Sequence, residues 1–180
     1  GAGPAGLFCA YILAEAGFRP IVIERGSRVE KRTCDVQKFW ESGILNPKSN
    51  VQFGEGGAGT FSDGKLNTSV KDPSGRNRLV LETFVRFGAD PSILYDNKPH
   101  IGTDVLSEVI VNMREFLVDK GATFVFDTCV NNLDIVSQKL LSVYTDSDSN
   151  SNSEIKTDVC VLALGHSARD TFDMLYNKGF

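Results

Sequence analysis

Hydrophobic residues near the start of the chain follow two different periods. Between residues 4 and 16 they recur at the spacing of one helical face, after a proline and before Gly17, so this stretch is predicted to form a helix. Residues 21–24 are instead a short run of β-branched residues ending in Glu24, which is typical of a parallel strand buried on both faces. A glycine-rich turn, a helix and a strand follow one another, and a preceding strand is expected to lead into the turn.

The segment that follows has no regular hydrophobic period. Within residues 26–70 only a short helix around 36–42 is predicted, and five glycines fall between Gly54 and Gly64. So many glycines leave few side chains to bury. The segment is therefore either mobile or pressed against something that requires close backbone approach. A further helix is predicted over 76–88.

The strongest helical pattern begins at Thr103, the predicted N-cap, keeps its apolar residues on one face and ends at Gly121. Short strands are predicted after it, and their close spacing favours a β-meander over a second βαβ unit. These strands cover 123–126, roughly 130–136 and 140–144.

The end of the chain contains a polar stretch, an apolar run and a helix. Residues 146–153 are rich in Ser, Asn and Asp and are predicted to form an exposed loop. The apolar run 159–163 follows and is closed by Gly165. Ser167 and Asp170 have the spacing of a capping box, so a final helix is predicted to begin there.

Composition excludes several classes of protein. A chain of 180 residues that is 41% hydrophobic and 23% charged can bury the core of one domain. Its 19 basic and 23 acidic residues give a net charge of −4 without a polybasic run, so no nucleic-acid partner is expected. Its apolar runs are far shorter than the roughly 20 residues of a membrane-spanning helix. We expect a soluble protein with the cytoplasm as its compartment, and this stretch of sequence allows no localisation signal to be read.

The glycine-rich turn at the start of the chain carries the first chemical signal. Gly1, Gly3 and Gly6 form a GxGxxG motif, whose glycines permit a tight turn, close approach to a pyrophosphate and packing of helix on strand. Glu24 lies at the end of the next strand, about 20 residues on, where a carboxylate accepts hydrogen bonds from the adenosine ribose. An acidic residue there also disfavours a 2′-phosphate, so NADP is not expected at this site.

Four separated motifs together resemble a known family. They are the GAGPAG turn with Glu24-Arg25, residues 54–66, residues 99–104 and residues 163–170. In these motifs the chain is similar to a family of uncharacterised FAD-dependent, or NAD(FAD)-utilising, dehydrogenases of the glutathione-reductase-like superfamily. The resemblance covers nearly the whole chain. It implies an α/β fold: an FAD/NAD(P)-binding, Rossmann-like, doubly wound parallel sheet with an inserted β-meander.

The resemblance also implies a role for each matching residue. The turn Gly1, Gly3, Pro4, Ala5 and Gly6 would hold the FAD pyrophosphate, and Glu24 with Arg25 the adenosine ribose. Arg32 would lie near the phosphates, the alternative being a solvated surface arginine. The glycine-rich segment would follow the pyrophosphate, ribityl chain and flavin through Gly57, Ala58, Gly59, Ser62, Gly64, Lys65 and Leu66, unless it is a flexible loop. The backbone of Val130 would meet adenine, and Ala163, Gly165 and His166 would form the second FAD motif, where a strand ends.

Departures from the superfamily restrict the chemistry. Ala58 and Thr60 stand where disulfide reductases carry a redox cysteine pair, so disulfide reduction by that mechanism is not expected. The four cysteines lie far apart and form no metal motif, so no metal is predicted. His100 and His166 are the only histidines, and a lone histidine is more often a packed residue than a catalyst. No catalytic residue is assigned.

The sequence thus predicts an FAD-dependent oxidoreductase of unknown substrate that transfers hydride through its flavin, with NAD(P)H as a possible electron donor. Residues 1–180 are expected to be a fragment of the FAD-binding domain, lacking its leading strand and a downstream substrate domain, and inactive alone. Two alternatives stay open. One is an NAD-dependent Rossmann dehydrogenase, which would show a second βαβ unit soon after Glu24. The other is a non-catalytic FAD-binding module or an inactive fragment.

Overall fold

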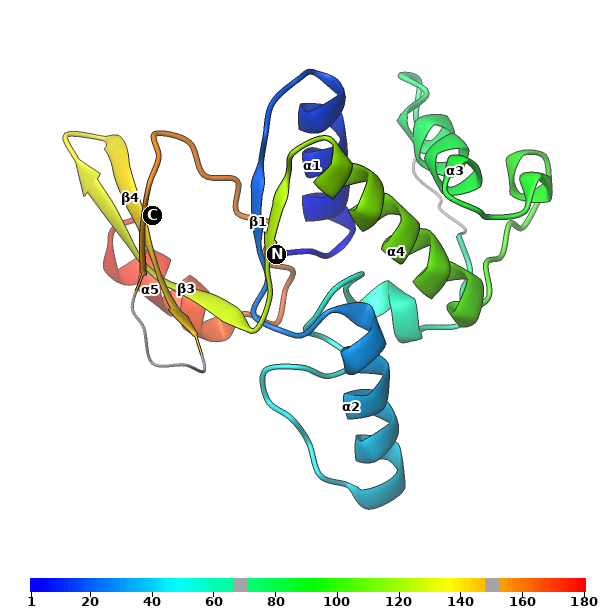
Figure 1. Cartoon of the computed structure of the whole chain (residues 1–180), viewed down its shortest axis with the longest axis horizontal. Coiled ribbons are helices and arrows are strands. Elements are labelled where there is room, and N and C mark those ends of the chain that lie inside the picture. The colour runs from blue at the N-terminus through cyan, green and yellow to red at the C-terminus, as the bar shows by residue number, and fades with distance from the viewer. Residues whose placement is uncertain (67–70, 148–152) are drawn as a thin grey trace.

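Two parallel strands lie near the middle of the molecule (Figure 1). The computed structural model describes residues 1–66, 71–147 and 153–180. Strand β1 (Ile21–Ile23) pairs with β2 (Thr123–Val125), and Val22 lies opposite Phe124. The prediction that 123–126 opens a meander is therefore wrong. The reason is the helix before it, whose C-terminal turn at Gly121 (φ 93°) returns the chain alongside β1.

The two predicted helices that lie beside this sheet are confirmed. Helix α1 (Pro4–Glu15) begins at its proline and packs on α4 (Thr103–Asp119), as Figure 1 shows. The two helices bury one apolar face each, including Leu7, Tyr11, Val109 and Met113. The N-cap of α4 is Gly102 rather than the predicted Thr103, because Gly102 is the last residue with extended backbone angles (φ −58°, ψ 151°).

Helix α2 is much longer than the sequence predicts. It spans Val29–Ser42 where a short helix around 36–42 was expected, and α3 spans Arg76–Arg86 close to its prediction. The buried face of α2 consists of Val29, Arg32 and Val36, and a buried arginine interrupts the apolar period that marks a helix. Two short 3₁₀ helices, η1 (Ala58–Phe61) and η2 (Pro91–Leu94), complete the crossover from β1 to β2.

The β-meander is present as a separate antiparallel sheet. Strands β3 (Thr128–Val136), β4 (Lys139–Ser147) and β5 (Ser153–Lys156) pair in chain order. The β3–β4 turn places Ser137 and Gln138 at positive φ (51° and 63°), as a tight two-residue hairpin requires. The predicted loop 146–153 is partly wrong, since its ends lie in β4 and β5, and its residues 148–152 lie outside the described ranges.

The last predicted helix is confirmed as α5 (Arg169–Asn177), which lies against β3. Its N-cap is Ala168, and no side chain caps it, so the predicted capping box at Ser167 is wrong. The run 159–163 forms no strand, and Val159 and Val161 are 71% and 58% exposed. A strand needs a hydrogen-bonded neighbour, and no strand of the described part of the chain pairs with this run.

The described residues form the mixed α/β class that the sequence predicts, with a parallel sheet between helices and a meander. Figure 1 places the meander and α5 on one side of β1 and β2, and α1 and α4 on the other. None of the helices in the described part of the chain has the length and apolar character that crossing a membrane requires.

Candidate dinucleotide site

Segments from four parts of the chain meet around one hollow at the carboxyl end of β1. They are the glycine-rich turn with the start of α1, the end of β1, the loop around Gly54, and the segment 163–171, with the start of β3 beside them. In open α/β sheets, ligands bind outside the carboxyl ends of the strands. The hollow is thus at the position where such a fold binds its ligand.

The turn offers free backbone donors to this hollow. Gly3 is the N-cap of α1, no side chain caps the helix, and Pro4 fills its first position. An uncapped helix start presents unpaired N–H groups and a positive dipole end, which together favour an anion such as a phosphate. A Cβ added to Gly3 would meet only the Cα of Gly57, at 3.7 Å, so the side of Gly3 toward the hollow is open.

The other two motif glycines have packing roles. A Cβ on Gly1 would overlap the carbonyl oxygen of Ala163, and a Cβ on Gly6 would overlap that of Gly1. Gly6 does not line the hollow. Its small size instead allows the start of α1 to fold back on the turn, which is the helix-packing role of the third glycine in the motif.

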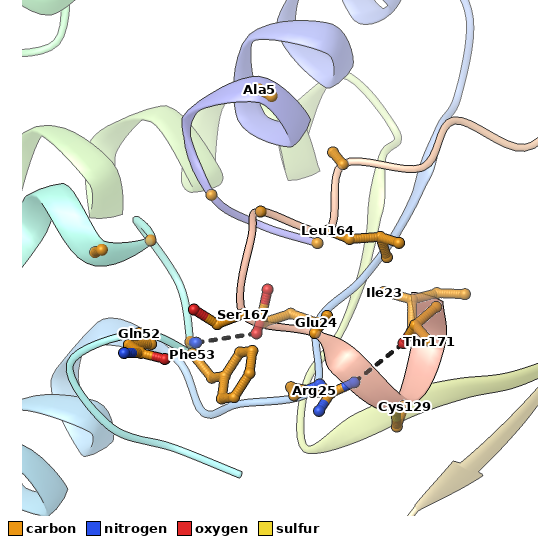
Figure 2. A pocket seen from close by; sticks show the side chains of 18 of the residues that line it. Ala5, Ile23, Glu24, Arg25, Gln52, Phe53, Cys129, Leu164, Ser167 and Thr171 are labelled. Carbon is orange, nitrogen blue, oxygen red and sulfur yellow. Dashed lines mark hydrogen bonds between the residues drawn. The ribbon is translucent and has the colours of Figure 1, made fainter. Parts of the chain in front are cut away.

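Glu24 ties three of the surrounding segments together. It is 6% exposed, and its carboxylate accepts N–H hydrogen bonds from Ala2 (2.7 Å), Gly26 (2.9 Å) and Gly54 (3.0 Å). Figure 2 shows this side chain in the wall of the hollow. A carboxylate has about four acceptor positions, so one remains for a hydroxyl of a bound ligand. Glu24 therefore both shapes the site and can still accept a ligand hydrogen bond.

Arg25 is held by partners on both sides. Its guanidinium lies 4.6 Å from the centre of the Phe53 ring and donates to Asp170 (2.8 Å) and Thr171 (3.2 Å) of α5. Figure 2 shows Arg25, Phe53 and Thr171 close together at one end of the hollow. The hydrogen bond from Arg25 lowers the pKa of Asp170. The pair is therefore ionised at neutral pH and connects α5 to the end of β1.

Arg32 is not exposed to solvent, and it is not among the residues that line the hollow. It is fully buried and donates to the backbone carbonyls of Asn50 (2.9 Å), Val51 (3.0 Å), Glu55 (2.6 Å) and Gly57 (2.9 Å). The alternative of a solvated surface arginine is wrong, because the glycine-rich loop wraps around the guanidinium and takes up its donors, while a position near the phosphates stays a prediction. Arg32 instead fixes the loop that forms one wall of the hollow.

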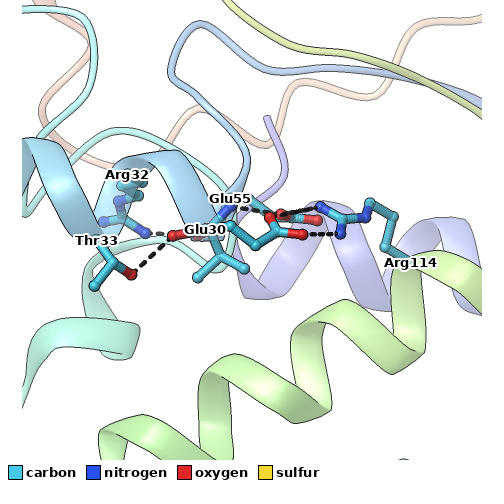
Figure 3. A network of polar contacts seen from close by, with 6 residues as sticks. Glu30, Arg32, Thr33, Glu55 and Arg114 are labelled. Carbon is cyan, nitrogen blue, oxygen red and sulfur yellow. Dashed lines mark hydrogen bonds and ion pairs between the residues drawn. The ribbon is translucent and has the colours of Figure 1, made fainter.

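A buried acid fixes the same loop from the opposite side (Figure 3). Glu55 is fully buried, and its Oε2 accepts from the Val29 N–H (2.8 Å) and from Arg114 of α4 (2.7 Å). Arg114 also pairs with Glu30 of α2 (2.6 Å). Burial raises the pKa of Glu55 to about 7, and the Val29 N–H and Arg114 offset this only in part. The loop is therefore tied to α2 and to α4 through one carboxyl group.

The raised pKa of Glu55 predicts a pH-dependent stability. An unfolded glutamate titrates near 4.5, and folded Glu55 near 7, so the folded protein holds the extra proton between these values. The stabilisation is complete below pH 4.5 and is lost as the pH rises through about 7, by up to about 3 kcal/mol. Glu55→Gln removes this titration. Urea unfolding measures the free energy of unfolding at pH 5.5 and at pH 8. The decrease from pH 5.5 to pH 8 should be about 2 kcal/mol smaller in the variant than in the natural protein. Equal pH dependence in both proteins would contradict this role.

The structure gathers most of the predicted cofactor-binding residues around the hollow. Those that line it are Gly1, Gly3, Pro4, Ala5, Glu24, Arg25, Gly57, Ala58, Val130, Ala163, Gly165 and His166. The lining residues that the prediction missed are Ile23, Gln52, Phe53, Gly54, Thr128, Cys129, Leu164, Ser167, Ala168 and Thr171. Most of them lie close to predicted residues in sequence, whereas Gln52 and Phe53 precede the glycine-rich stretch and Thr171 lies in α5.

The second half of the glycine-rich segment lies apart from the hollow. Gly59, Ser62, Gly64, Lys65 and Leu66 are not among its lining residues. Lys65 forms an exposed ion pair with Asp63 (2.9 Å), and His100 hydrogen-bonds the Asp63 carbonyl (2.8 Å). Leu66 packs against the core. This segment pairs with residues 99–101 instead of turning toward the helix start.

Comparison with known proteins agrees with the geometry of the turn. Residues 1–30, which hold the GxGxxG turn, α1, β1 and Glu24, match the family model of an NAD(P)-binding Rossmann-like domain. The chain has a Rossmann-like fold. This Rossmann-like chain superimposes on the THI4 protein of Thermovibrio ammonificans with a TM-score of 0.59 and 18% sequence identity. The superposition covers 99% of this chain and 60% of the THI4 chain.

One relative is close in sequence. An uncharacterized protein of Clostridium beijerinckii is 46% identical over 178 residues, which are 99% of this chain and 32% of the relative. The chain thus spans about a third of the length of this relative.

Proposed function

We propose that the hollow binds the adenosine and pyrophosphate part of FAD, and that the protein is a flavoprotein oxidoreductase. The observation that carries the proposal is the uncapped start of α1, open at Gly3 and facing Gly57, beside the buried carboxylate of Glu24. A phosphate needs the donors and the positive dipole end, and a ribose needs the acceptor. Both lie in the wall of one hollow.

The residues present fit such a cofactor. The N–H groups at the start of α1 would bind the pyrophosphate, and Gly3 places no side chain beside them. Glu24 would accept from the ribose hydroxyls with its remaining acceptor position. The backbone of Val130, at the start of the meander, would meet the adenine edge. Bound flavin would supply hydride transfer, and NAD(P)H is the proposed donor of electrons.

A second candidate is an NAD-dependent dehydrogenase that uses the same hollow. The description of the matching family model and the parallel pairing of β1 with β2 favour it. Against it stands the crossover of residues 24–122, whose described part contains three α-helices, two 3₁₀ helices and the glycine-rich loop instead of a single helix. A simple βαβ nucleotide unit needs only about 30 residues.

Ligand competition separates the two candidates. The full natural protein, stripped of bound cofactor, is titrated with FAD while flavin fluorescence is followed, and ADP and NAD⁺ are added as competitors. If the proposal holds, FAD binds, ADP displaces it, and NADH reduces the flavin under anaerobic conditions without displacing it. If NAD⁺ binds with an affinity that FAD cannot match, the dehydrogenase candidate replaces the proposal.

A further inference from the structure

Arg25 lies between two acidic groups at one end of the hollow. It directly follows Glu24 in sequence, and its guanidinium donates to Asp170 at 2.8 Å and to Thr171 at 3.2 Å. Its own side chain is 16% exposed, whereas that of Asp170 is 63% exposed. Asp170 and Thr171 come from the first turn of α5, almost 150 residues away in the chain, so the contact depends on the tertiary fold.

The position of this arginine matters for the choice of nucleotide. In Rossmann-type sites an acidic residue at the end of the second strand accepts from the ribose 2′-hydroxyl, and an arginine nearby accommodates a 2′-phosphate. This chain has both, Glu24 and Arg25, side by side in the wall of the hollow. An arginine free to turn toward the ribose would partly cancel the repulsion that Glu24 exerts on a 2′-phosphate.

Resting on the proposed function, we propose that Asp170 is a specificity-determining residue that prevents Arg25 from accepting a 2′-phosphate. The carboxylate neutralises the guanidinium and fixes it by a hydrogen bond, while the Phe53 ring, 4.6 Å away, supports its other face. Because the charges of Arg25 and Asp170 cancel, the negative charge of Glu24 is left facing the ribose, and the site takes an adenosine with a free 2′-hydroxyl.

The surrounding groups support this division of charge. Thr171 also accepts from Arg25 and lines the hollow, so the arginine is held at the ligand-facing end of α5. The hydrogen bond from Arg25 is the main reason that the pKa of Asp170 lies below its usual range. The carboxylate therefore keeps its charge at neutral pH. Asp170 also accepts from the Thr171 N–H (2.9 Å). An asparagine can retain both acceptor contacts through its Oδ1, so Asp170→Asn changes the charge with little change of shape.

The test compares two ligands that differ only at the 2′ position, ADP-ribose and 2′-phospho-ADP-ribose. Their dissociation constants are measured by calorimetry on the full natural protein stripped of flavin, with Asp170→Asn and with Asp173→Asn as a control. Asp173 lies on the same helix, and its side chain is exposed. We expect the natural protein to prefer ADP-ribose, and Asp170→Asn to reduce that preference by about tenfold or more. The control should leave the preference unchanged.

A second variant assigns the effect to Arg25. In the double variant Arg25→Met with Asp170→Asn, the affinity gained for the 2′-phosphate should disappear, and raising the salt concentration should weaken the gain in the single variant. A change of preference below about threefold in Asp170→Asn, with ADP-ribose still bound, would overturn this inference alone. Failure of ADP-ribose to bind the natural protein would overturn the proposed function, and this inference with it.

Discussion

Replacing Gly3 with alanine is expected to weaken FAD binding by about 30-fold or more without lowering the thermal stability of the protein. The backbone angles of Gly3 (φ −75°, ψ −177°) suit any residue, and the new methyl group would meet only Gly57, at 3.7 Å. In the bound state, however, the methyl group would occupy space through which the pyrophosphate approaches the helix start. Overpacking of this kind costs about 2 kcal/mol, which corresponds to the stated loss of affinity. Flavin fluorescence titration and thermal unfolding measure the two effects.

Gly6→Ala is the matched control for this experiment. Its methyl group would overlap the Gly1 carbonyl oxygen, so it should lower the unfolding temperature as well as the affinity. If Gly3→Ala bound FAD as well as the natural protein, the pyrophosphate would not lie at the start of α1. The contrast between the two glycines separates ligand approach from packing.

Arg32→Met is expected to lower the free energy of unfolding by about 3 to 5 kcal/mol. It removes the donor to four backbone carbonyls, two in buried and two in part-buried hydrogen bonds. Arg32→Lys keeps the charge but loses the fork of donors, so we expect an intermediate loss. Urea unfolding measures both. FAD affinity should fall in the same order, because the loop that Arg32 holds forms one wall of the hollow.

Arg78→Met serves as the control for loss of an arginine. Arg78 is exposed and pairs with Glu82 one turn along α3 (2.7 Å), so its removal should cost less than about 1 kcal/mol. Equal stability of the Arg32→Met and Arg78→Met variants would contradict the buried role assigned to Arg32. Arg32 would then have to be a phosphate ligand or a surface residue, as expected from the sequence.

Much of the fold follows from hydrophobic period alone. Helices α1, α3 and α4 and the strand β1 were predictable because each has an uninterrupted apolar pattern and clear end signals. Strand β2 was placed in the wrong sheet, because three residues carry no information about their neighbour. Helix α2 was largely missed because its buried face contains Arg32, which a hydrophobic pattern cannot distinguish from a surface residue.

The candidate site was predictable where it is local in sequence. The motif glycines and Glu24 lie within one turn–helix–strand unit, so their spacing is enough to bring them together. Phe53, Thr171 and the contact from Asp170 to Arg25 depend on the packing of distant segments. The role of Arg32 is likewise set by the loop that wraps around it. No pattern within the sequence gives these relations.

The most direct test of FAD binding is the visible absorption spectrum of the full natural protein as purified, with the released cofactor identified by mass. We predict the visible absorption bands of a protein-bound flavin, and release of FAD on denaturation. A colourless protein that takes up no added FAD would contradict the central claim. It would leave a Rossmann-like nucleotide-binding fold whose ligand is another dinucleotide.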